Sequence, residues 1–142
     1  MHITESDLFL GLDHAVMKAI ADISEEAFYT ERSIIFQEGE NAGGLYILGE
    51  GVADLVLDGD TRIYSLTERS EVFGWSSLIE SAKYTASALC ITDVTALKID
   101  TRKLHRIFDR HPAAGLTVFK RLTAIYNRRL STTYRKLLAA MK

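Results

Sequence analysis

Short apolar runs separated by turn residues fill the middle of the chain, while helical spacing marks its two ends. The β-type runs cover residues 33–36, 45–48, 52–57, 62–66, 85–91 and 94–99. Turn signals lie between them, and Asp58-Gly59-Asp60 predicts a two-residue hairpin because Asp-Gly favours positive φ. Regular short strands of this kind indicate an antiparallel sandwich or roll.

Helical patterns flank this predicted roll on both sides. Val16, Met17 and Ile20 have the spacing of a helix capped near Asp13. After the last strand, residues 101–108 predict a short helix, and Pro112 suits the first turn of a longer one. We therefore expect a single α+β domain over residues 1–142, with N-terminal helices at 1–30, the roll at 31–100 and C-terminal helices at 101–142.

The long C-terminal helix carries a seam of residues at alternating steps of three and four, which is typical of a coiled coil. The seam consists of Leu116, Phe119, Thr123, Tyr126, Leu130, Thr133 and Leu137. A second row, formed by Val118, Leu122 and Ile125, is placed to pack on the roll. The seam favours a homodimer, and its packing against the chain's own roll is the alternative.

Composition limits the protein class. The chain has 142 residues, of which 47% are apolar and only one is proline, so it can bury a sizeable core. It has no apolar run long enough for a membrane span and no secretion signal, and we expect a soluble cytoplasmic protein. The one cysteine, Cys90, falls in a predicted strand and is expected to be a buried, inert thiol.

Charge is unevenly distributed, although the net charge is only −2. Residues 102–142 contain eleven Lys or Arg and a single acid, and the rest of the chain contains six basic and eighteen acidic residues. A basic helical region of this kind can contact nucleic acid or an acidic protein partner. It can also simply dock on the acidic body of its own chain.

Catalytic and metal chemistry find little support in the sequence. The four histidines, His2, His14, His105 and His111, all lie outside the predicted strands, so no metal cluster forms inside the roll. Ser76 and Ser77 lack the strand-turn-helix elbow of a hydrolase. We expect no enzymatic activity and no metal site.

The most informative motif spans residues 73–88. Phe73-Gly74-Trp75-Ser76-Ser77-Leu78 is followed, after a short loop, by Tyr84-Thr85-Ala86-Ser87-Ala88. A glycine there permits a tight turn, and the first turn of a short helix offers free N–H groups to a phosphate. Together with Phe36-Gln37-Glu38-Gly39-Glu40 and the glycines of 44–51, the motif resembles the cyclic nucleotide-binding domains of the catabolite activator (Crp/Fnr-like) family. The resemblance covers nearly the whole chain.

The resemblance implies an antiparallel β-roll of the double-stranded β-helix, jelly-roll-like type, and a non-enzymatic signal-transduction module that dimerises along its long helix. It also implies a Glu after the glycine to accept from the ribose and an Arg to pair with the phosphate, where this chain has Trp75 and Tyr84. A charged hydrogen bond contributes about 1.5–3 kcal/mol, so both losses would weaken cyclic nucleotide binding by about a hundredfold or more.

Three functions therefore stay open. The first is a sensor whose altered pocket takes another small anionic or aromatic effector. The second is a protein-interaction or dimerisation module with a vestigial pocket, and the third is a weak receptor for cyclic AMP or cyclic GMP. No cofactor is predicted with certainty. A protein partner is compatible with all three.

The candidate ligand-binding residues come from the motif and from the long helix. The motif supplies Phe73, Gly74, Trp75, Ser76, Ser77, Leu78, Tyr84, Thr85 and Ser87, and the helix supplies Arg128 and Thr132, with Arg129 and Thr133 beside them. A solvated basic face is the alternative for the helix residues. Family members that regulate transcription continue into a helix-turn-helix, whereas this sequence stops at Lys142, so we expect no sequence-specific DNA binding.

Overall fold

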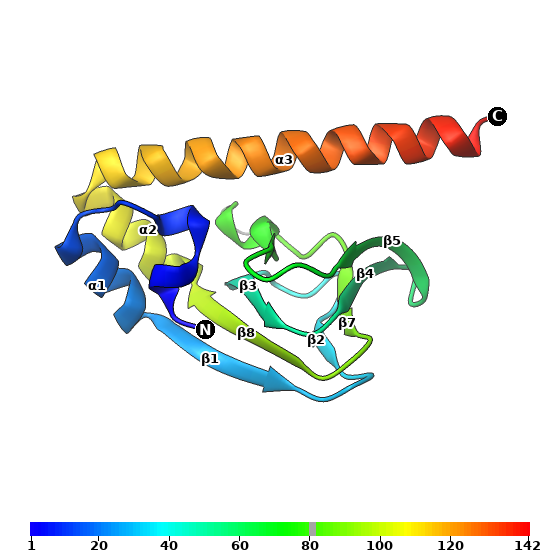
Figure 1. Cartoon of the computed structure of the whole chain (residues 1–142), viewed down its shortest axis with the longest axis horizontal. Helices are drawn as coiled ribbons and strands as arrows, with labels where there is room; N and C mark the ends of the chain where they lie inside the picture. The colour runs from blue at the N-terminus through cyan, green and yellow to red at the C-terminus, as the bar shows by residue number, and fades with distance from the viewer. Residues whose placement is uncertain (80–81) are drawn as a thin grey trace.

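The computed structural model describes residues 1–79 and 82–142. In chain order its elements are η1 (Ile3–Glu5), η2 (Asp7–Phe9), α1 (His14–Asp22), β1 (Ser24–Tyr29), β2 (Ile34–Phe36), β3 (Gly44–Glu50), β4 (Ala53–Leu57), β5 (Thr61–Leu66), β6 (Val72–Phe73), η3 (Trp75–Leu78), β7 (Ser87–Cys90), β8 (Val94–Asp100), α2 (Thr101–Arg110) and α3 (Pro112–Ala140). The predicted α+β architecture, with a β-roll and a long C-terminal helix, is confirmed (Figure 1).

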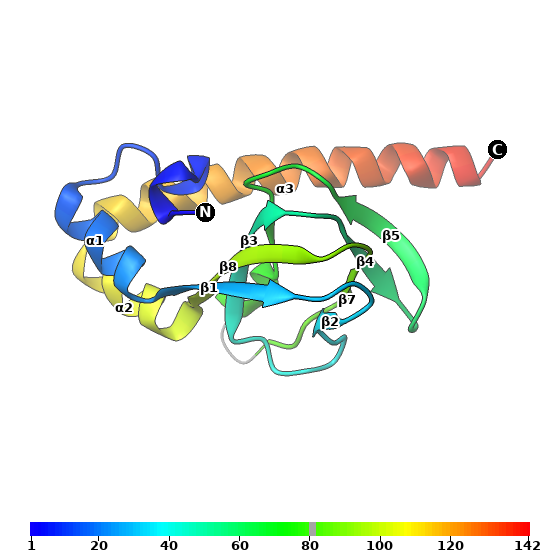
Figure 2. The same cartoon turned by 60° about the horizontal axis from the view of Figure 1, so that its bottom comes forward.

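The described strands form two four-stranded antiparallel sheets. One has the order β1-β8-β3-β6 and the other β2-β7-β4-β5, and together they make the roll (Figure 2). Asp58 and Gly59 connect β4 to β5 with φ values of 54° and 92°, so the predicted hairpin turn is confirmed. Both residues have the positive φ that such a turn requires.

The prediction of helices throughout residues 1–30 is wrong at its end. Residues 24–29 form the strand β1, which pairs with β8 from Ser24 opposite Ile99 to Tyr29 opposite Val94. Nothing in the local pattern of this segment indicates a strand. It forms a strand through its backbone pairing with β8, which is distant in the sequence.

Two apolar clusters stabilise the fold. The first lies between the sheets and includes Phe36, Tyr46, Phe73 and Cys90. The Cys90 thiol is 1% exposed and burial raises its pKa, which confirms the predicted buried thiol. The second cluster joins the outer face of β3 and β8 to the helices.

Helix α3 is anchored through its first half and exposed along its second. Val118 and Leu122 are buried in the cluster between the helices and the outer sheet face, and Ile125 packs against it. In contrast, residues 131–142 are all exposed. The helix runs along one side of the roll (Figure 1). None of the helices in the described residues is long and apolar enough to cross a membrane.

Candidate functional site

The motif at residues 73–88 begins with a tight turn at Gly74, although residues 80 and 81 lie outside the described part of the chain. Gly74 has a φ of 77°, and a Cβ there would lie 3.0 Å from the Gly44 carbonyl and 3.0 Å from the Tyr46 ring. The helix η3 follows as predicted. However, the amide and the hydroxyl of Ser77 both donate to the Gly74 carbonyl, at 3.1 and 2.7 Å. Neither group is free for a phosphate.

Tyr84 occupies the interior of the roll. Its side chain stacks on Phe36 with ring centroids 3.9 Å apart, and the residue is only 6% exposed. The hydroxyl donates to the Gly44 carbonyl at 2.8 Å and accepts from the Gly44 amide at 3.1 Å. Burial raises the pKa of this hydroxyl, so it stays neutral. Tyr84 thereby fastens the end of the loop to the first residue of β3.

Trp75 takes the opposite direction and faces the long helix. Its half-buried ring stacks on the ring of Tyr126 from α3, with centroids 4.1 Å apart. The guanidinium of Arg129, one turn further along α3, lies 4.3 Å from the Trp75 ring centroid. Trp75 thus forms the contact between η3 and α3.

Arg129 is the most heavily engaged charged residue of this region. Its guanidinium lies 4.7 Å from the Tyr64 ring, and Nη2 donates to the Val72 carbonyl at 2.6 Å. Nη2 also lies 3.6 Å from a carboxylate oxygen of Glu71, and the side chain is 12% exposed. Burial lowers the pKa of the guanidinium, and the nearby Tyr64 and Glu71 oppose that shift.

Glu71 is held independently of Arg129. Its carboxylate accepts from the amides of Thr67 and Glu68, at 2.8 and 2.9 Å, and from the hydroxyl of Tyr64 at 3.0 Å. These bonds fix the loop before β6 and position the Tyr64 ring. The acidic group is therefore already satisfied by the roll itself.

A groove of about 390 Å³ lies between α3 and the roll, and Tyr64, Glu71 and Arg129 form part of its wall. Its lining residues are Asp7, Leu8, Tyr64, Arg69, Ser70, Glu71, Val72, Ile125, Arg128, Arg129 and Thr132. Two of the predicted ligand residues, Arg128 and Thr132, are among them. A separate, larger cleft of about 540 Å³ lies at the other side of the roll, where Tyr84, Lys98 and Asp100 are part of its wall.

Comparison with known proteins identifies the fold. The family model of the cyclic nucleotide-binding domain matches residues 26–111. The chain belongs to the cyclic nucleotide-binding domain family. The solved structure of a "Putative Cyclic nucleotide-binding protein" from Geobacter metallireducens is 30% identical, with a TM-score of 0.79 over 88% of this chain and 92% of that one.

Two curated relatives are longer than this cyclic nucleotide-binding domain. Glutaminase 2 of Bradyrhizobium diazoefficiens is 28% identical over 92% of this chain, which spans 20% of that protein. The CRP-like cAMP-activated global transcriptional regulator of Mycobacterium tuberculosis is 24% identical over 92% of this chain, which spans 58% of it. The chain therefore corresponds to less than two thirds of either relative.

The other predicted ligand residues of this cyclic nucleotide-binding domain are dispersed. Phe73 belongs to the cluster between the sheets, and Ser76 is buried. The Ser87 hydroxyl accepts from the Glu38 amide at 2.8 Å, while Thr85 is exposed. The Leu78 carbonyl lies 3.1 Å from the His105 ring nitrogen Nε2. The structure places Trp75 against Tyr126 and Arg129 of α3, whereas Arg128 and Thr132 line the groove and Tyr84 lies inside the roll.

Sequence reasoning missed two residues around the Arg129 guanidinium, Tyr64 and Glu71. Arg129 itself was among the helix candidates. One signal was present: the row Val118, Leu122 and Ile125 indicates which side of α3 faces the roll, and Arg129 continues this row at helical spacing. Tyr64 offered no such signal, because its partner lies on another element.

Only some residues of the predicted dimer seam are exposed and without contacts to the rest of the described chain. Leu116, Leu130 and Leu137 are 59%, 47% and 58% exposed. In contrast, Tyr126 stacks on Trp75, and Phe119 packs edge-on against Phe108 with centroids 5.9 Å apart. Thr123 and Thr133 donate to carbonyls one turn earlier in the same helix. Two seam aromatics thus have partners within the chain.

Proposed function

We propose that this domain is a non-enzymatic regulatory module that senses a small anionic or aromatic effector through an altered pocket. One observation carries the proposal: Trp75 and Tyr84 stand where the family resemblance implies the ribose and phosphate contacts. Tyr84 is bonded to the backbone of Gly44, and Trp75 is stacked against α3. Neither side chain supplies the charge that a cyclic phosphate or a ribose hydroxyl needs.

The groove between α3 and the roll supports a small effector. Its volume of about 390 Å³ lies near the lower end of the range for ligand pockets, which is about 300–1,000 Å³. Arg128 is exposed at its wall and can meet an anion, whereas Arg69 is paired with Glu5 at 2.8 Å and Glu71 is already hydrogen-bonded within the roll. Tyr64 and Ile125 add apolar surface for a ring.

The regulatory output would be the position of α3. An effector in this groove touches both the roll and the helix, so it favours whichever helix position gives it more contacts. The available energy is the difference between its affinities for the two positions. A change at α3 would reach a homodimer formed through Leu130 and Leu137, or a protein partner of the basic helix.

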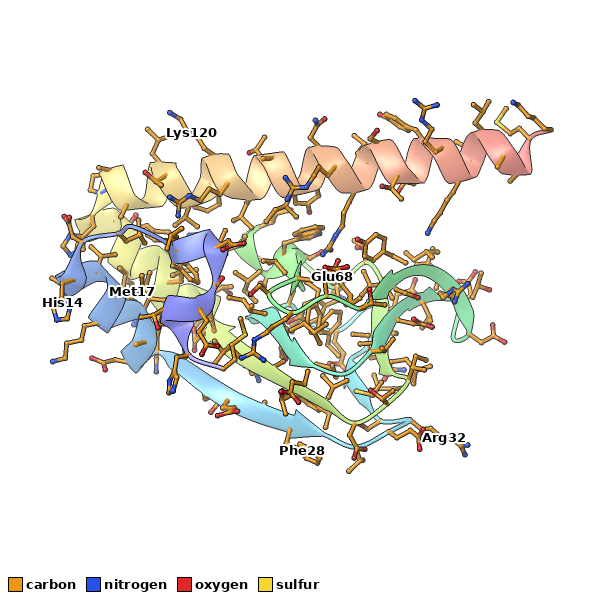
Figure 3. The ribbon with its side chains drawn as sticks, in the orientation of Figure 1. His14, Met17, Phe28, Arg32, Glu68 and Lys120 are labelled. Atoms are coloured by element: carbon orange, nitrogen blue, oxygen red, sulfur yellow. The ribbon has the colours of Figure 1, made fainter. Side chains whose placement is uncertain are left out.

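A second function, dimerisation or partner binding with a vestigial pocket, is favoured by a separate observation. The last part of α3 exposes Leu130, Tyr134, Leu137, Leu138 and Met141, at 47–75% exposure. Arg135, Lys136 and Lys142 are the basic residues of this part of the chain. In the first half of α3, Lys120 projects away from the roll (Figure 3). The weak cyclic nucleotide receptor is the third candidate.

Calorimetric titration of the purified chain separates these functions. Cyclic AMP, cyclic GMP, linear AMP and a panel of aromatic carboxylates are titrated into the wild type. The Arg128→Ala and Thr132→Ala variants test the groove, and Arg135→Ala is the matched control because Arg135 is exposed and does not line it.

We expect cyclic nucleotides to bind weakly or not at all, and at least one member of the effector panel to bind. That binding should weaken in Arg128→Ala and Thr132→Ala but not in Arg135→Ala. Submicromolar binding of cyclic AMP would overturn the altered pocket and support the receptor. A lack of response to every compound, together with a stable dimer, would favour the interaction module.

A further inference from the structure

Four flat groups from two parts of the molecule are in contact with one another in sequence. Tyr64 and Trp75 come from the roll side, and Arg129 and Tyr126 come from α3. The successive distances are 4.7 Å from Tyr64 to the guanidinium, 4.3 Å from the guanidinium to Trp75, and 4.1 Å from Trp75 to Tyr126. The guanidinium therefore lies over the faces of both the Tyr64 and the Trp75 ring, and the space that it fills is called the slot here.

The Arg129 guanidinium in this slot forms only part of the hydrogen bonds that it could donate. Nη2 donates to the Val72 carbonyl at 2.6 Å. Nη1, in contrast, is fully buried and has no hydrogen-bond partner among the described residues. A buried donor without a partner is destabilising. The stack thus includes a cation that would gain hydrogen bonds by leaving.

The slot itself does not depend on Arg129. Glu71 accepts three hydrogen bonds from Thr67, Glu68 and Tyr64, which hold the Tyr64 ring in place. On the other wall, Gly74 and η3 position Trp75. Both walls would stay in position if another planar group replaced the guanidinium.

We propose that the slot between Tyr64 and Trp75 is the seat for a planar, π-rich group of the effector, and that Arg129 fills it while the effector is absent. This inference rests on the proposed sensing function and names how its pocket is kept closed. The slot adjoins the groove that Arg128 and Thr132 line. An effector with a flat ring and an anionic group would stack in the slot and meet the displaced Arg129 in the groove.

Displacement of Arg129 would loosen the second half of α3. Val118 and Leu122 are buried and anchor the first half. Beyond them, Ile125 packs against the same cluster. Among the described residues, Tyr126 and Arg129 also contact the roll, and the Lys136 ammonium lies 3.3 Å from the Ile63 carbonyl and 5.5 Å from the Tyr64 ring. Arg129 therefore acts as a latch between helix and roll.

The latch is tested first without any effector. Arg129→Gln and Arg129→Lys are compared with the wild type and with Arg135→Gln, an exposed arginine on the same helix. Trp75 is the one tryptophan of the chain, so its fluorescence reports on the stack. Hydrogen exchange of amides 126–140 reports on the helix.

We expect Arg129→Gln and Arg129→Lys to shift the Trp75 emission and to speed exchange in 126–140 by about tenfold. Glutamine loses the cation–π contacts and the charged hydrogen bond, whereas lysine loses the planar group that lies over both rings. Arg135→Gln should match the wild type. Lysine keeps the charge but is not planar. If Arg129→Lys matched the wild type in both readouts, the ion pair rather than the slot would hold the helix, and the proposal would fail.

Chemical complementation then tests the slot. Arg129→Ala is titrated with ethylguanidinium chloride, a free copy of the missing group, and with ethylammonium chloride at equal ionic strength. We expect a saturable change of Trp75 emission with ethylguanidinium in Arg129→Ala, and none in the wild type or in Arg135→Ala. Equal responses to the two salts would overturn the slot.

The two proposals can fail separately. Complementation needs no natural effector, so a panel of nucleotides and carboxylates that gives no heat would count against the sensing function while ethylguanidinium still binds. Conversely, an effector that binds the wild type without changing Trp75 emission or α3 exchange would refute the latch and leave the sensing function in place.

Discussion

Removal of the Tyr84 hydroxyl tests whether the residue at the family's arginine position has become part of the fold. In Tyr84→Phe the ring keeps its stack on Phe36, so no cavity forms. The change deletes the two hydrogen bonds to Gly44, at 2.8 and 3.1 Å, at a site that is 6% exposed. The substitution therefore isolates the polar contribution of this side chain.

The expected loss follows from those two bonds. An intramolecular hydrogen bond contributes about 0.5–1.5 kcal/mol net, and a buried group left without its partner costs about 1–3 kcal/mol. For the amide and carbonyl of Gly44 together we expect a decrease of about 2–3 kcal/mol in the free energy of unfolding. In a domain of this size the melting temperature would then fall by roughly 6–12 °C.

The assay is urea denaturation at one fixed protein concentration, with the slope compared between variants. Tyr134→Phe is the matched control, because Tyr134 is 61% exposed and should change stability by less than about 0.5 kcal/mol. If Tyr84→Phe were as stable as that control, the hydroxyl would not hold the loop. Tyr84 would then remain available to a ligand, against the altered-pocket proposal.

Three further predictions concern other parts of the chain. Leu137→Glu should turn a homodimer into a monomer in sedimentation analysis, and a monomeric wild type would refute the seam. Cys90 should react with a thiol reagent at pH 8 only after unfolding, because burial raises its pKa; rapid reaction of the folded protein would contradict this. Gly74→Ala should cost about 2–4 kcal/mol in urea denaturation, since its φ is 77° and its Cβ would meet Gly44 and Tyr46 at 3.0 Å; wild-type stability would contradict the strained turn.

The elements that could be predicted are those whose signal is local. Asp58-Gly59 encodes its own positive φ, and the alternating runs around it mark β4 and β5. Pro112 marks the start of α3 in the same way. The strand β1 escaped prediction because it exists through its pairing with β8, which is far away in the sequence. Strand β6 has only two residues and carries no periodicity at all.

In the candidate site, too, features with a local sequence signal could be predicted and features that depend on distant contacts could not. The frame of the motif could be predicted, because Gly74 and the short helix after it are determined by local geometry. The directions of the Trp75 and Tyr84 side chains could not be predicted. Both residues belong to one motif in the sequence, but Trp75 packs on α3 and Tyr84 packs inside the roll. Arg128 and Arg129 are adjacent, and the row Val118, Leu122 and Ile125 is the one sequence signal that distinguishes the buried Arg129 from the exposed Arg128.

The position of Tyr126 links ligand binding to assembly. It belongs to the predicted seam, yet its ring is stacked on Trp75. Leu130 and Leu137 are exposed, so a dimer through them can form while the latch is closed. A dimer that also uses Tyr126 requires this ring to leave Trp75. Release of Arg129 would weaken the same stack, and an effector that opens the latch should therefore extend the seam by one aromatic residue per chain.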